Sequence, residues 1–231
     1  MHATCQRDWE WQNPPAHGPA PRQQMLSNAT DHDHASVLRT ASRFRPVDTA
    51  DFAPILQTLQ CRDLAPGESL LHAGQPEPGE YFVLHGLLRI SVADEHGREV
   101  TLDFPQGPGI LPPAMTRMAG GCSRVDCQAL EPTRVARFGR ELLVTLMLRS
   151  PVLQQWGEAV MHAELLRRAD REWRLAALPA LERLQLLRRE HPTLEQRAPH
   201  RLVASYLGIT PVSLSRLRAQ LLRENRPPQP C

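Results

Sequence analysis

Hydrophobic and polar residues alternate with a period of two in the middle of the chain. The alternation is clearest within residues 88–92 and 99–104, and it returns within residues 125–129. A period of two predicts β-strands with one buried face. The intervening residues 94–97, DEHG, are typical of a hairpin turn, since Asp and Gly favour tight turns. We therefore predict a small antiparallel β-roll of the jelly-roll type over residues 46–150.

From Pro151 onward the spacing of apolar residues changes to three and four, which predicts one long amphipathic helix over residues 151–178. At about 1.5 Å per residue, the stretch from Pro151 to Leu175 extends about 37 Å, long enough to pack against a two-fold mate. We predict that this helix links two domains and contributes to a homodimer. The alternative is a helix packed on its own β-domain. The apolar positions are Leu153, Trp156, Val160, Ala163, Leu166, Ala169 and Trp173.

Two short helices that cross at a tight turn are predicted within residues 200–218, HRLVASYLGITPVSLSRLR. Gly208 follows the last apolar position of the first helix, where glycine readily adopts the left-handed conformation that ends a helix. Thr210 can cap the second helix, and Pro211 falls at its first position, where a fixed dihedral is favourable. The pattern therefore predicts a helix-turn-helix. Its two buried faces are formed by Val203, Ala204 and Leu207 and by Ile209, Leu214, Leu217 and Leu221.

The other positions of the second helix form an outer surface near its N-terminal end. Arg216 carries a planar set of donors that matches the O6 and N7 acceptors of guanine, so we predict that it reads sequence. Thr210, Ser213 and Arg218 are better suited to phosphate oxygens, which fix register on double-stranded DNA. The alternative is an ordinary helical hairpin with solvated arginines. The predicted DNA-binding residues are Thr210, Val212, Ser213, Ser215, Arg216 and Arg218.

Residues 1–45 have no hydrophobic period and are rich in proline, histidine and small polar residues. Such a segment cannot bury enough surface to offset the entropy lost on ordering, so we predict a disordered tail. Residues 31–34, DHDH, could bind a divalent metal weakly, but a solvated tail explains them more simply. The predicted class is α+β, with a tail at residues 1–45, a β-roll at 46–150, a linking helix at 151–178 and a helix-turn-helix domain at 179–231.

Charge is divided unevenly along the chain. The formal net charge is +2, from 27 basic and 25 acidic residues, and every basic residue is arginine. Residues 165–231 carry 13 arginines and 6 acidic residues, a net charge of +7, whereas residues 1–164 carry −5. A basic C-terminal region suits a polyanionic partner, in agreement with the predicted DNA-binding element.

Cysteine content and hydropathy indicate a cytoplasmic protein. The five cysteines, an odd number without a C-x-x-C pair, form no convincing disulfide framework. No stretch is apolar for long enough to span a bilayer, and the N-terminus lacks the features of a secretory signal. We therefore expect a soluble cytoplasmic protein that does not bind a membrane.

The order of the predicted elements and one sequence string resemble the Crp/Fnr family of bacterial transcription regulators. The string is VASYLGITPVSLSR at residues 203–216, and residues 181–183 are similar to the segment that leads into the family's DNA-binding domain. The resemblance covers about residues 46–222. It implies a homodimer that binds a palindromic promoter site, with two recognition helices in successive major grooves about 34 Å apart, and it implies contact with RNA polymerase.

This chain departs from the cofactor-binding members of the family that it resembles. Cyclic-nucleotide binders have a glycine–glutamate cassette with an arginine and a serine or threonine. Residues 109–124 here have no glutamate, which argues against a cyclic nucleotide, although Ser123 and Arg124 could still bind an effector phosphate. Iron–sulfur members cluster their cysteines, whereas those of this chain are scattered. We expect no cofactor, and haem bound by His72 or His85 remains an open alternative.

Two further departures concern DNA recognition. Val212 stands where family members often carry a glutamate that accepts from cytosine N4, and valine offers only apolar contact, for instance to a thymine methyl. We therefore expect a different operator. Only residues 223–231 follow the second helix, too few for a full β-hairpin, so we expect a short or missing wing.

Two other functions are weighed against DNA binding. A β-barrel enzyme could hold a metal among His72, His85 and His96, but their spacing lacks the ligand pattern of a cupin-like oxygenase, so we expect neither a metal nor an enzyme. A redox sensor could switch through a disulfide between Cys122 and Cys127. Cysteines of this kind are more often small buried hydrophobes, and such a switch would supplement DNA binding.

Overall fold

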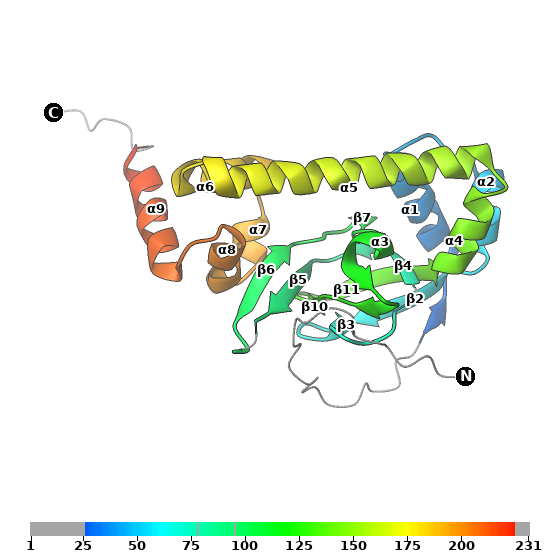
Figure 1. The fold of residues 1–231 in the computed structure, drawn as a ribbon, viewed down its shortest axis with the longest axis horizontal. Coiled ribbons are helices and arrows are strands. Elements are labelled where there is room, and N and C mark those ends of the chain that lie inside the picture. Colours follow the sequence, from blue (N-terminus) through cyan, green and yellow to red (C-terminus); the bar gives the residue numbers. More distant parts are fainter. Residues whose placement is uncertain (1–25, 78, 95, 225–231) are drawn as a thin grey trace. The chain divides into compact units, whose positions relative to one another are not determined.

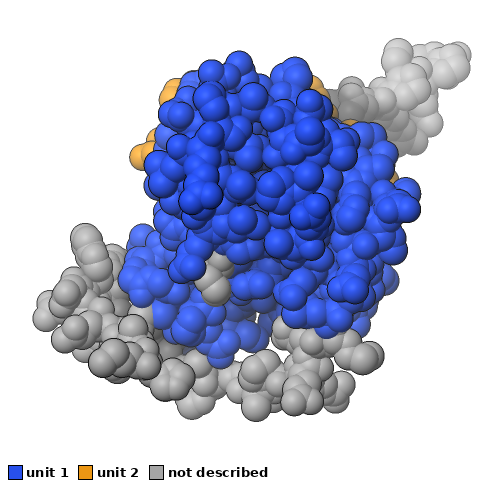
Figure 2. Space-filling view, turned by 90° about the vertical axis from the view of Figure 1, so that its right-hand side faces the viewer, with its two compact units in different colours: residues 1–168 blue, residues 169–231 orange. Residues whose placement is uncertain are grey.

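The computed structural model describes residues 26–77, 79–94 and 96–224. The chain divides into two compact units, residues 1–168 and 169–231 (Figure 2). The first unit contains a rolled antiparallel sheet with helices, and every described element of the second unit is a helix. The predicted α+β class is therefore confirmed. None of the described helices is both long and apolar enough to cross a membrane.

The strands of the first unit form two antiparallel sheets and a short ribbon (Figure 1). The strands are β1 (Ser27–Asn28), β2 (Gln60–Leu64), β3 (Ser69–Leu71), β4 (Gly79–His85), β5 (Leu88–Ala93), β6 (Glu99–Asp103), β7 (Gly109–Ile110), β8 (Met118–Ala119), β9 (Cys122–Ser123), β10 (Asp126–Ala129) and β11 (Thr133–Gly139). One sheet has the order β1-β2-β11-β4-β7, and the other has the order β3-β10-β5-β6. Strands β8 and β9 pair as the ribbon. The three strands predicted from alternation are confirmed as β5, β6 and β10.

The predicted hairpin turn joins β5 to β6. The Asp94 carboxylate accepts hydrogen bonds from the backbone N–H groups of His96 at 3.0 Å and Arg98 at 2.8 Å. Gly97 has a φ of 74°, a conformation that glycine adopts without a steric penalty. The turn therefore follows from its aspartate and its glycine, as the sequence indicates.

Strand β4 is buried on both faces because the second sheet covers one and helices cover the other. Tyr81 and Val83 lie in an apolar cluster between the sheets. Phe82 and Leu84 lie in a second cluster beneath helices at one end of the roll (Figure 1). These helices are α1 (Asp31–Ala41), α2 (Thr49–Leu56) and α5 (Pro151–Ala177). Two shorter helices, α3 (Ala114–Arg117) and α4 (Arg140–Met147), complete the first unit.

The predicted disordered tail is wrong for residues 26–45, which form β1 and α1, whereas residues 1–25 lie outside the described part of the chain. Thr30 and Asp33 form a reciprocal capping box at the start of α1, and Val37 and Ala41 are fully buried. The Arg134 side chain donates to both Asp33 oxygens, at 3.1 and 3.0 Å. The acidic DHDH segment is therefore a helix start tied to the sheet, and not a solvated tail.

Helix α5 begins at the predicted residue and ends one residue early. Its first turns bury Leu153, Trp156 and Val160, and the Trp156 indole N–H donates to the carbonyl of Ala41 at 3.1 Å. The alternative of a helix packed on its own β-domain therefore describes this part of α5. Leu165 and Leu166, one and a half turns further on, are each 57% exposed. The boundary between the two units falls at residue 168, within α5, and not at the predicted residue 178.

The second unit contains the end of α5 and four more helices: α6 (Ala180–Glu190), α7 (Leu194–Arg197), α8 (His200–Tyr206) and α9 (Pro211–Glu224). The Arg171 guanidinium lies 4.0 Å from the centre of the Tyr206 ring, and Arg174 forms a bidentate pair with Glu190 at 2.6 and 2.7 Å. These contacts attach the last turns of α5 to this unit. The predicted short or missing wing concerns residues 225–231, which lie outside the described residues.

Candidate DNA-binding surface and effector site

The turn between α8 and α9 has the predicted geometry. Gly208 adopts a φ of 67° directly after α8, and its N–H donates to the Ser205 carbonyl at 3.0 Å. The Thr210 hydroxyl accepts from the backbone N–H of Ser213 at 3.1 Å, so it caps α9, and Pro211 is the first helical residue. The glycine and the cap together fix where α9 starts and in which direction it runs.

The two helices share a small apolar core. Ala204 on α8 is fully buried, as expected where two backbones approach closely, and Leu214 on α9 is buried opposite α8. Leu217 and Ile209 are only half-buried. The buried side chains of this core are Leu202, Val203, Ala204, Leu207, Leu214 and Leu221. These contacts hold one face of α9 inward and leave the opposite face for a partner.

The outward face of α9 carries the predicted base-contacting residues. Val212 is 61% exposed, and Ser215 and Arg216 are also exposed. Ser213 is half-buried, and its hydroxyl lies 2.9 Å from that of Thr210. Within the described residues, no hydrogen bond or ion pair occupies the Arg216 guanidinium. Thr210, Val212, Ser213, Ser215 and Arg216 therefore lie together at the exposed N-terminal end of α9.

Arg218 is placed differently from the rest of the predicted set. Its guanidinium donates to Glu195 on α7 at 2.7 Å, and only 18% of its side chain is exposed. Arg188 on α6 pairs with the same carboxylate. Burial opposes ionisation of Glu195, but the hydrogen bonds from the two arginines hold its pKa below the ordinary value. This arrangement favours a structural role for Arg218 over the predicted phosphate contact.

Glu195 was not among the residues predicted from the sequence, because no local pattern links it to Arg188 or Arg218. The three residues come from three helices, seven and 23 positions apart in the chain. The only signal is an acidic residue in a strongly basic segment, which is weak by itself. The pairing therefore depends on how the helices of the second unit pack.

In the first unit, the two residues predicted to bind an effector phosphate differ in burial. The Ser123 hydroxyl is buried and donates to the carbonyl of Val125 at 2.7 Å, within its own turn. Arg124 is exposed, and its backbone N–H donates to the Arg117 carbonyl at 2.8 Å. The engagement of Ser123 argues against a phosphate contact there, and the effector site stays a prediction.

Arg117 and Glu80 are two buried charged residues in or beside α3 that were not predicted as site residues from the sequence. Arg117 is 1% exposed, and it donates to the carbonyls of Pro112 at 3.0 Å and Gly79 at 2.5 Å. The Glu80 carboxylate accepts from the N–H of Ala114, at the start of α3, at 3.0 Å, and burial raises its pKa. Both side chains thus attach α3 to β4, so their role is structural.

Neither a metal site nor a disulfide between Cys122 and Cys127 is present among the described residues. No group of three or more histidine, cysteine or acidic side chains is placed there to hold a metal, so His72, His85 and His96 are not brought together. Cys122 is disulfide-bonded, whereas Cys127 is a free, buried thiol, and burial raises its pKa to about 12. The two cysteines are therefore not bonded to each other, and since the thiolate is the reactive form, Cys127 is better described as a small buried hydrophobe.

Comparisons with known proteins identify the first unit. Residues 61–150 match the family described as cyclic nucleotide-binding domain. No curated protein matches the chain. Among solved structures, FixK2 from Bradyrhizobium japonicum has a TM-score of 0.63 and 19% identity, over 72% of this chain and 85% of its own. CLP from Xanthomonas campestris, described as a c-di-GMP responsive global regulator, has a TM-score of 0.60 and 17% identity. This match covers 77% of the present chain and 93% of CLP.

A third solved structure, that of CprK complexed with OCPA, has a TM-score of 0.57 and 20% identity, and the match covers 75% of this chain and 83% of CprK. At these identities the matches establish a shared fold. Different compounds are named for two of these proteins, c-di-GMP for CLP and OCPA for CprK.

Two features of residues 109–124 argue against a cyclic nucleotide. The stretch has no glutamate, and the Ser123 hydroxyl is engaged within its own turn. Arg168 on α5 donates to the carbonyl of Thr116 on α3 at 3.1 Å, so α5 is bonded directly to this stretch. That no cyclic nucleotide binds stays a prediction from the sequence.

Proposed function

Because residues 61–150 belong to the cyclic nucleotide-binding domain family and the chain has the fold of Crp/Fnr regulators, we propose that this protein is a sequence-specific DNA-binding transcription regulator. The resemblance predicted from the sequence is confirmed by this domain and fold. We place the protein in the cytoplasm, bound as a homodimer to a palindromic promoter site. A role as an enzyme has no support in the described residues.

The observation that carries this proposal is the exposed end of α9. Arg216 projects from a helix whose start is fixed by Thr210 and whose opposite face is held by Leu214, so its side chain leaves the exposed face at a defined point, and among the described residues its guanidinium has no partner. An arginine placed in this way is available for bidentate recognition of guanine in the major groove. The net charge of +7 in residues 165–231 adds attraction to the phosphate backbone.

The homodimer is supported by the uncovered part of α5. Leu165 and Leu166 are exposed on a helix whose preceding turns are buried, and Trp173 is exposed two turns later. Large apolar side chains along one helix are favourable at a two-fold interface, where each helix covers the other. Contact with RNA polymerase remains an expectation from the resemblance.

The test begins with selection of bound sites from a pool of random duplexes, because the operator sequence is unknown. Affinities for the selected duplex and for a scrambled duplex are then measured by fluorescence anisotropy. Arg216→Ala is expected to weaken binding to the selected duplex by about 10- to 100-fold, since a bidentate base contact is worth roughly 1–3 kcal/mol. Its salt-sensitive binding to the scrambled duplex is expected to persist.

Arg189→Ala provides the matched control. Arg189 is an exposed arginine of the same unit, but it lies on α6 and is not among the predicted DNA-binding residues. This control removes the same charge, and its preference for the selected duplex is expected to equal that of the parent protein. An Arg216→Ala protein that keeps the full preference would contradict the assignment.

A further inference from the structure

The turn between α8 and α9 lies against the end of α5, and both belong to the second unit. A Cβ atom added at Gly208 would lie 3.3 Å from the Cδ2 atom of Leu175. The turn is therefore in close contact with the last turns of α5. Two arginines from neighbouring helices, Arg171 on α5 and Arg183 on α6, donate to the backbone at the same place.

The carbonyls at the C-terminal end of α8 are satisfied in two ways. Those of Val203, Ala204 and Ser205 accept from backbone N–H groups of the cap and the turn, at 3.0 Å in each case. The next two, those of Tyr206 and Leu207, accept from arginine side chains of other helices. The last carbonyls of a helix have no donor within that helix, so another element can be attached there.

Arg171 makes two contacts with one residue of α8. Its Nη2 donates to the Tyr206 carbonyl at 3.1 Å, and its guanidinium lies 4.0 Å from the centre of the Tyr206 ring. A cation is favoured both near the C-terminal end of a helix and over an aromatic face. The carbonyl and the ring together define where the guanidinium lies, so Arg171 attaches the end of α8 to α5 in one orientation.

Arg183 connects the ends of two helices. Its Nε donates to the Leu207 carbonyl, directly after α8, at 3.1 Å, and its Nη1 donates to the Leu178 carbonyl, directly after α5, at 2.5 Å. The side chain is half-buried. The donors of a planar guanidinium have fixed relative positions, so Arg183 holds the two carbonyls at a defined separation.

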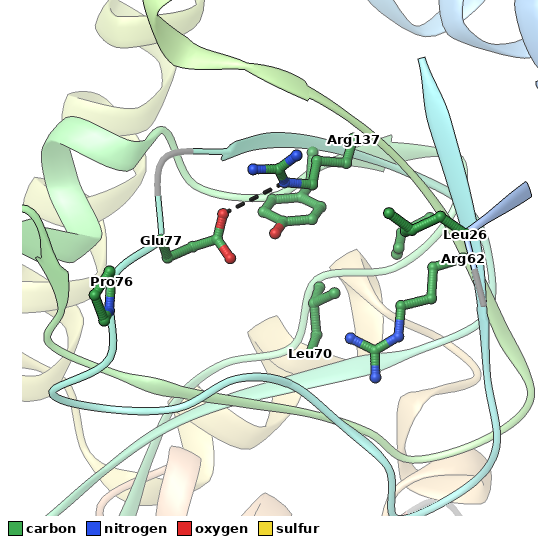
Figure 3. A pocket seen from close by; sticks show the side chains of 8 residues that line it. Leu26, Arg62, Leu70, Pro76, Glu77 and Arg137 are labelled. Carbon is green, nitrogen blue, oxygen red and sulfur yellow. Dashed lines mark ion pairs between the residues drawn. The ribbon is translucent and has the colours of Figure 1, made fainter. Parts of the chain in front are cut away.

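A bond to a backbone carbonyl locates a whole element, which a bond to a side chain does not. Arg62 and Arg137, which line a cavity of the first unit in Figure 3, each pair with a glutamate side chain. A glutamate can change rotamer while its strand or helix stays in place, whereas a carbonyl moves only with its own backbone. Arg171 and Arg183 therefore fix α8 itself relative to the last turns of α5.

We propose that Arg171 and Arg183 are positioning residues that set the direction of α9 relative to α5, and thereby the half-site spacing of the operator. Only residues 207–210 separate α8 from α9, so a fixed end of α8 also fixes the start of α9. In a homodimer packed through α5, the separation of the two recognition helices depends on that direction. This meaning for DNA recognition rests on the proposed function.

The test measures how strongly the full chain rejects a wrong half-site spacing. The selected duplex is remade with its half-sites one base pair closer and one base pair farther apart, and a further duplex carries a single half-site. One base pair changes the separation by about 3.4 Å and the relative rotation by about 35°. The parent protein is expected to bind both altered duplexes about tenfold more weakly in fluorescence anisotropy, because its two α9 helices cannot both enter the groove.

Arg171→Ala and Arg183→Ala are each expected to reduce this discrimination to about threefold or less, while affinity for the single half-site stays within about twofold of the parent value. A loosened turn lets α9 follow either spacing, but the residues that contact the bases remain. A role limited to folding would instead weaken binding to the single half-site by the same factor as binding to the full site.

Arg171→Lys is the conservative variant, because lysine keeps a cation for the Tyr206 ring and a donor for its carbonyl. It is expected to restore most of the discrimination that Arg171→Ala loses. Arg189→Ala is the control, since it removes the same charge from an exposed position of α6, and it is expected to discriminate as the parent does. Circular dichroism establishes that each variant is folded, and the Arg171 variants decide the test if Arg183→Ala does not fold.

A measurement without DNA separates this inference from the proposed function. Hydrogen exchange of peptides within residues 203–213 is expected to be about tenfold faster in the two alanine variants than in the parent, with exchange in residues 60–77 unchanged. A protein that ignores every duplex but shows this result would contradict the proposed function, and the spacing role with it, and would leave the attachment of the turn to α5 intact.

Three outcomes would overturn the positioning role. Unchanged hydrogen exchange in both alanine variants would show that the arginines do not hold the turn. Full discrimination in both folded variants would show that the spacing is set elsewhere. A parent protein with equal affinity for all three spacings would show that the direction of α9 does not select among them.

Discussion

The first unit buries arginines, whereas the second keeps them at its surface. Arg62, Arg89 and Arg117 are buried between or beside the sheets, where carbonyl, carboxylate and hydroxyl oxygens accept from them. In the second unit none of the described arginines is buried, and Arg174, Arg188 and Arg218 each pair with a carboxylate on another helix. Arginine therefore forms buried hydrogen bonds between elements of the first unit, and it supplies charge at or near the surface of the second unit.

The difference follows from what surrounds each guanidinium. A rolled sheet has edges and turns with backbone carbonyls that can accept from a buried arginine, as Gly79 and Pro112 do for Arg117. Most carbonyls within a helix accept from its own N–H groups, so backbone acceptors between helices are confined to helix ends, such as Leu178 and Leu207, which accept from the half-buried Arg183. Charge in a helical unit is therefore left at the surface, where it can meet a phosphate backbone.

The largest expected change in the free energy of unfolding comes from a substitution in the apolar core of the first unit. Leu153, at the start of α5, is 1% exposed against the roll. Leu153→Ala is expected to lower the free energy of unfolding by about 2–5 kcal/mol, from lost burial and from the cavity left behind. The measurement is the urea-unfolding midpoint of the full chain.

Leu148→Ala makes the same substitution at a side chain that is 84% exposed. Its expected effect is within about 0.5 kcal/mol. Similar losses in the two variants would mean that α5 does not anchor the first unit through this face.

An intermediate change in the free energy of unfolding is expected when the ion pair between α1 and the sheet is removed. The hydrogen bonds from Arg134 hold the pKa of Asp33 well below its ordinary value. The charged form therefore stabilises the fold above the unfolded-state pKa of about 3.9, and this stabilisation is lost as the pH falls through the lower folded-state pKa. Asp33→Asn is expected to destabilise the chain by on the order of 2 kcal/mol at pH 7 and by less at pH 3, in urea unfolding.

Asp63 is the matched control because it pairs with the same Arg134, at 2.7 Å, but its side chain is exposed. Asp63→Asn is expected to change stability by at most about 1 kcal/mol. If Asp33→Asn has the same effect at both pH values, the ionised pair is not the source of the stabilisation.

The smallest effect concerns the ion pair between α7 and α9 in the second unit. Arg218→Ala and Glu195→Gln, made singly and together, form a double-mutant cycle whose coupling energy is expected to be about 1 kcal/mol in thermal or urea unfolding, because the pair is largely buried and Glu195 keeps Arg188 as a second partner. Strict additivity would mean that the pair contributes no stability. A loss of affinity for all duplexes in Arg218→Ala, without any loss of stability, would instead support the phosphate contact predicted from the sequence.

The sequence determined the elements whose signals are local. Alternation predicted β5, β6 and β10, the spacing of apolar residues predicted α5, and Gly208, Thr210 and Pro211 predicted the turn before α9. Each of these depends on residues within a few positions of one another, so burial on one face or a single cap was enough to specify it. The family resemblance rested on the same local strings.

Only the tertiary structure decided which distant polar groups meet. The helix α1 was missed although Thr30 and Asp33 give it a local capping box, and its attachment to the sheet depends on Arg134, about 100 residues away. No sequence pattern indicates that Arg218 pairs with Glu195 or that Arg117 is buried. The same holds for the Arg62 Nε–H, which is buried without a hydrogen-bond partner among the described residues. A charged side chain can be solvated, paired or buried, and only the packing of whole elements around it selects among these states.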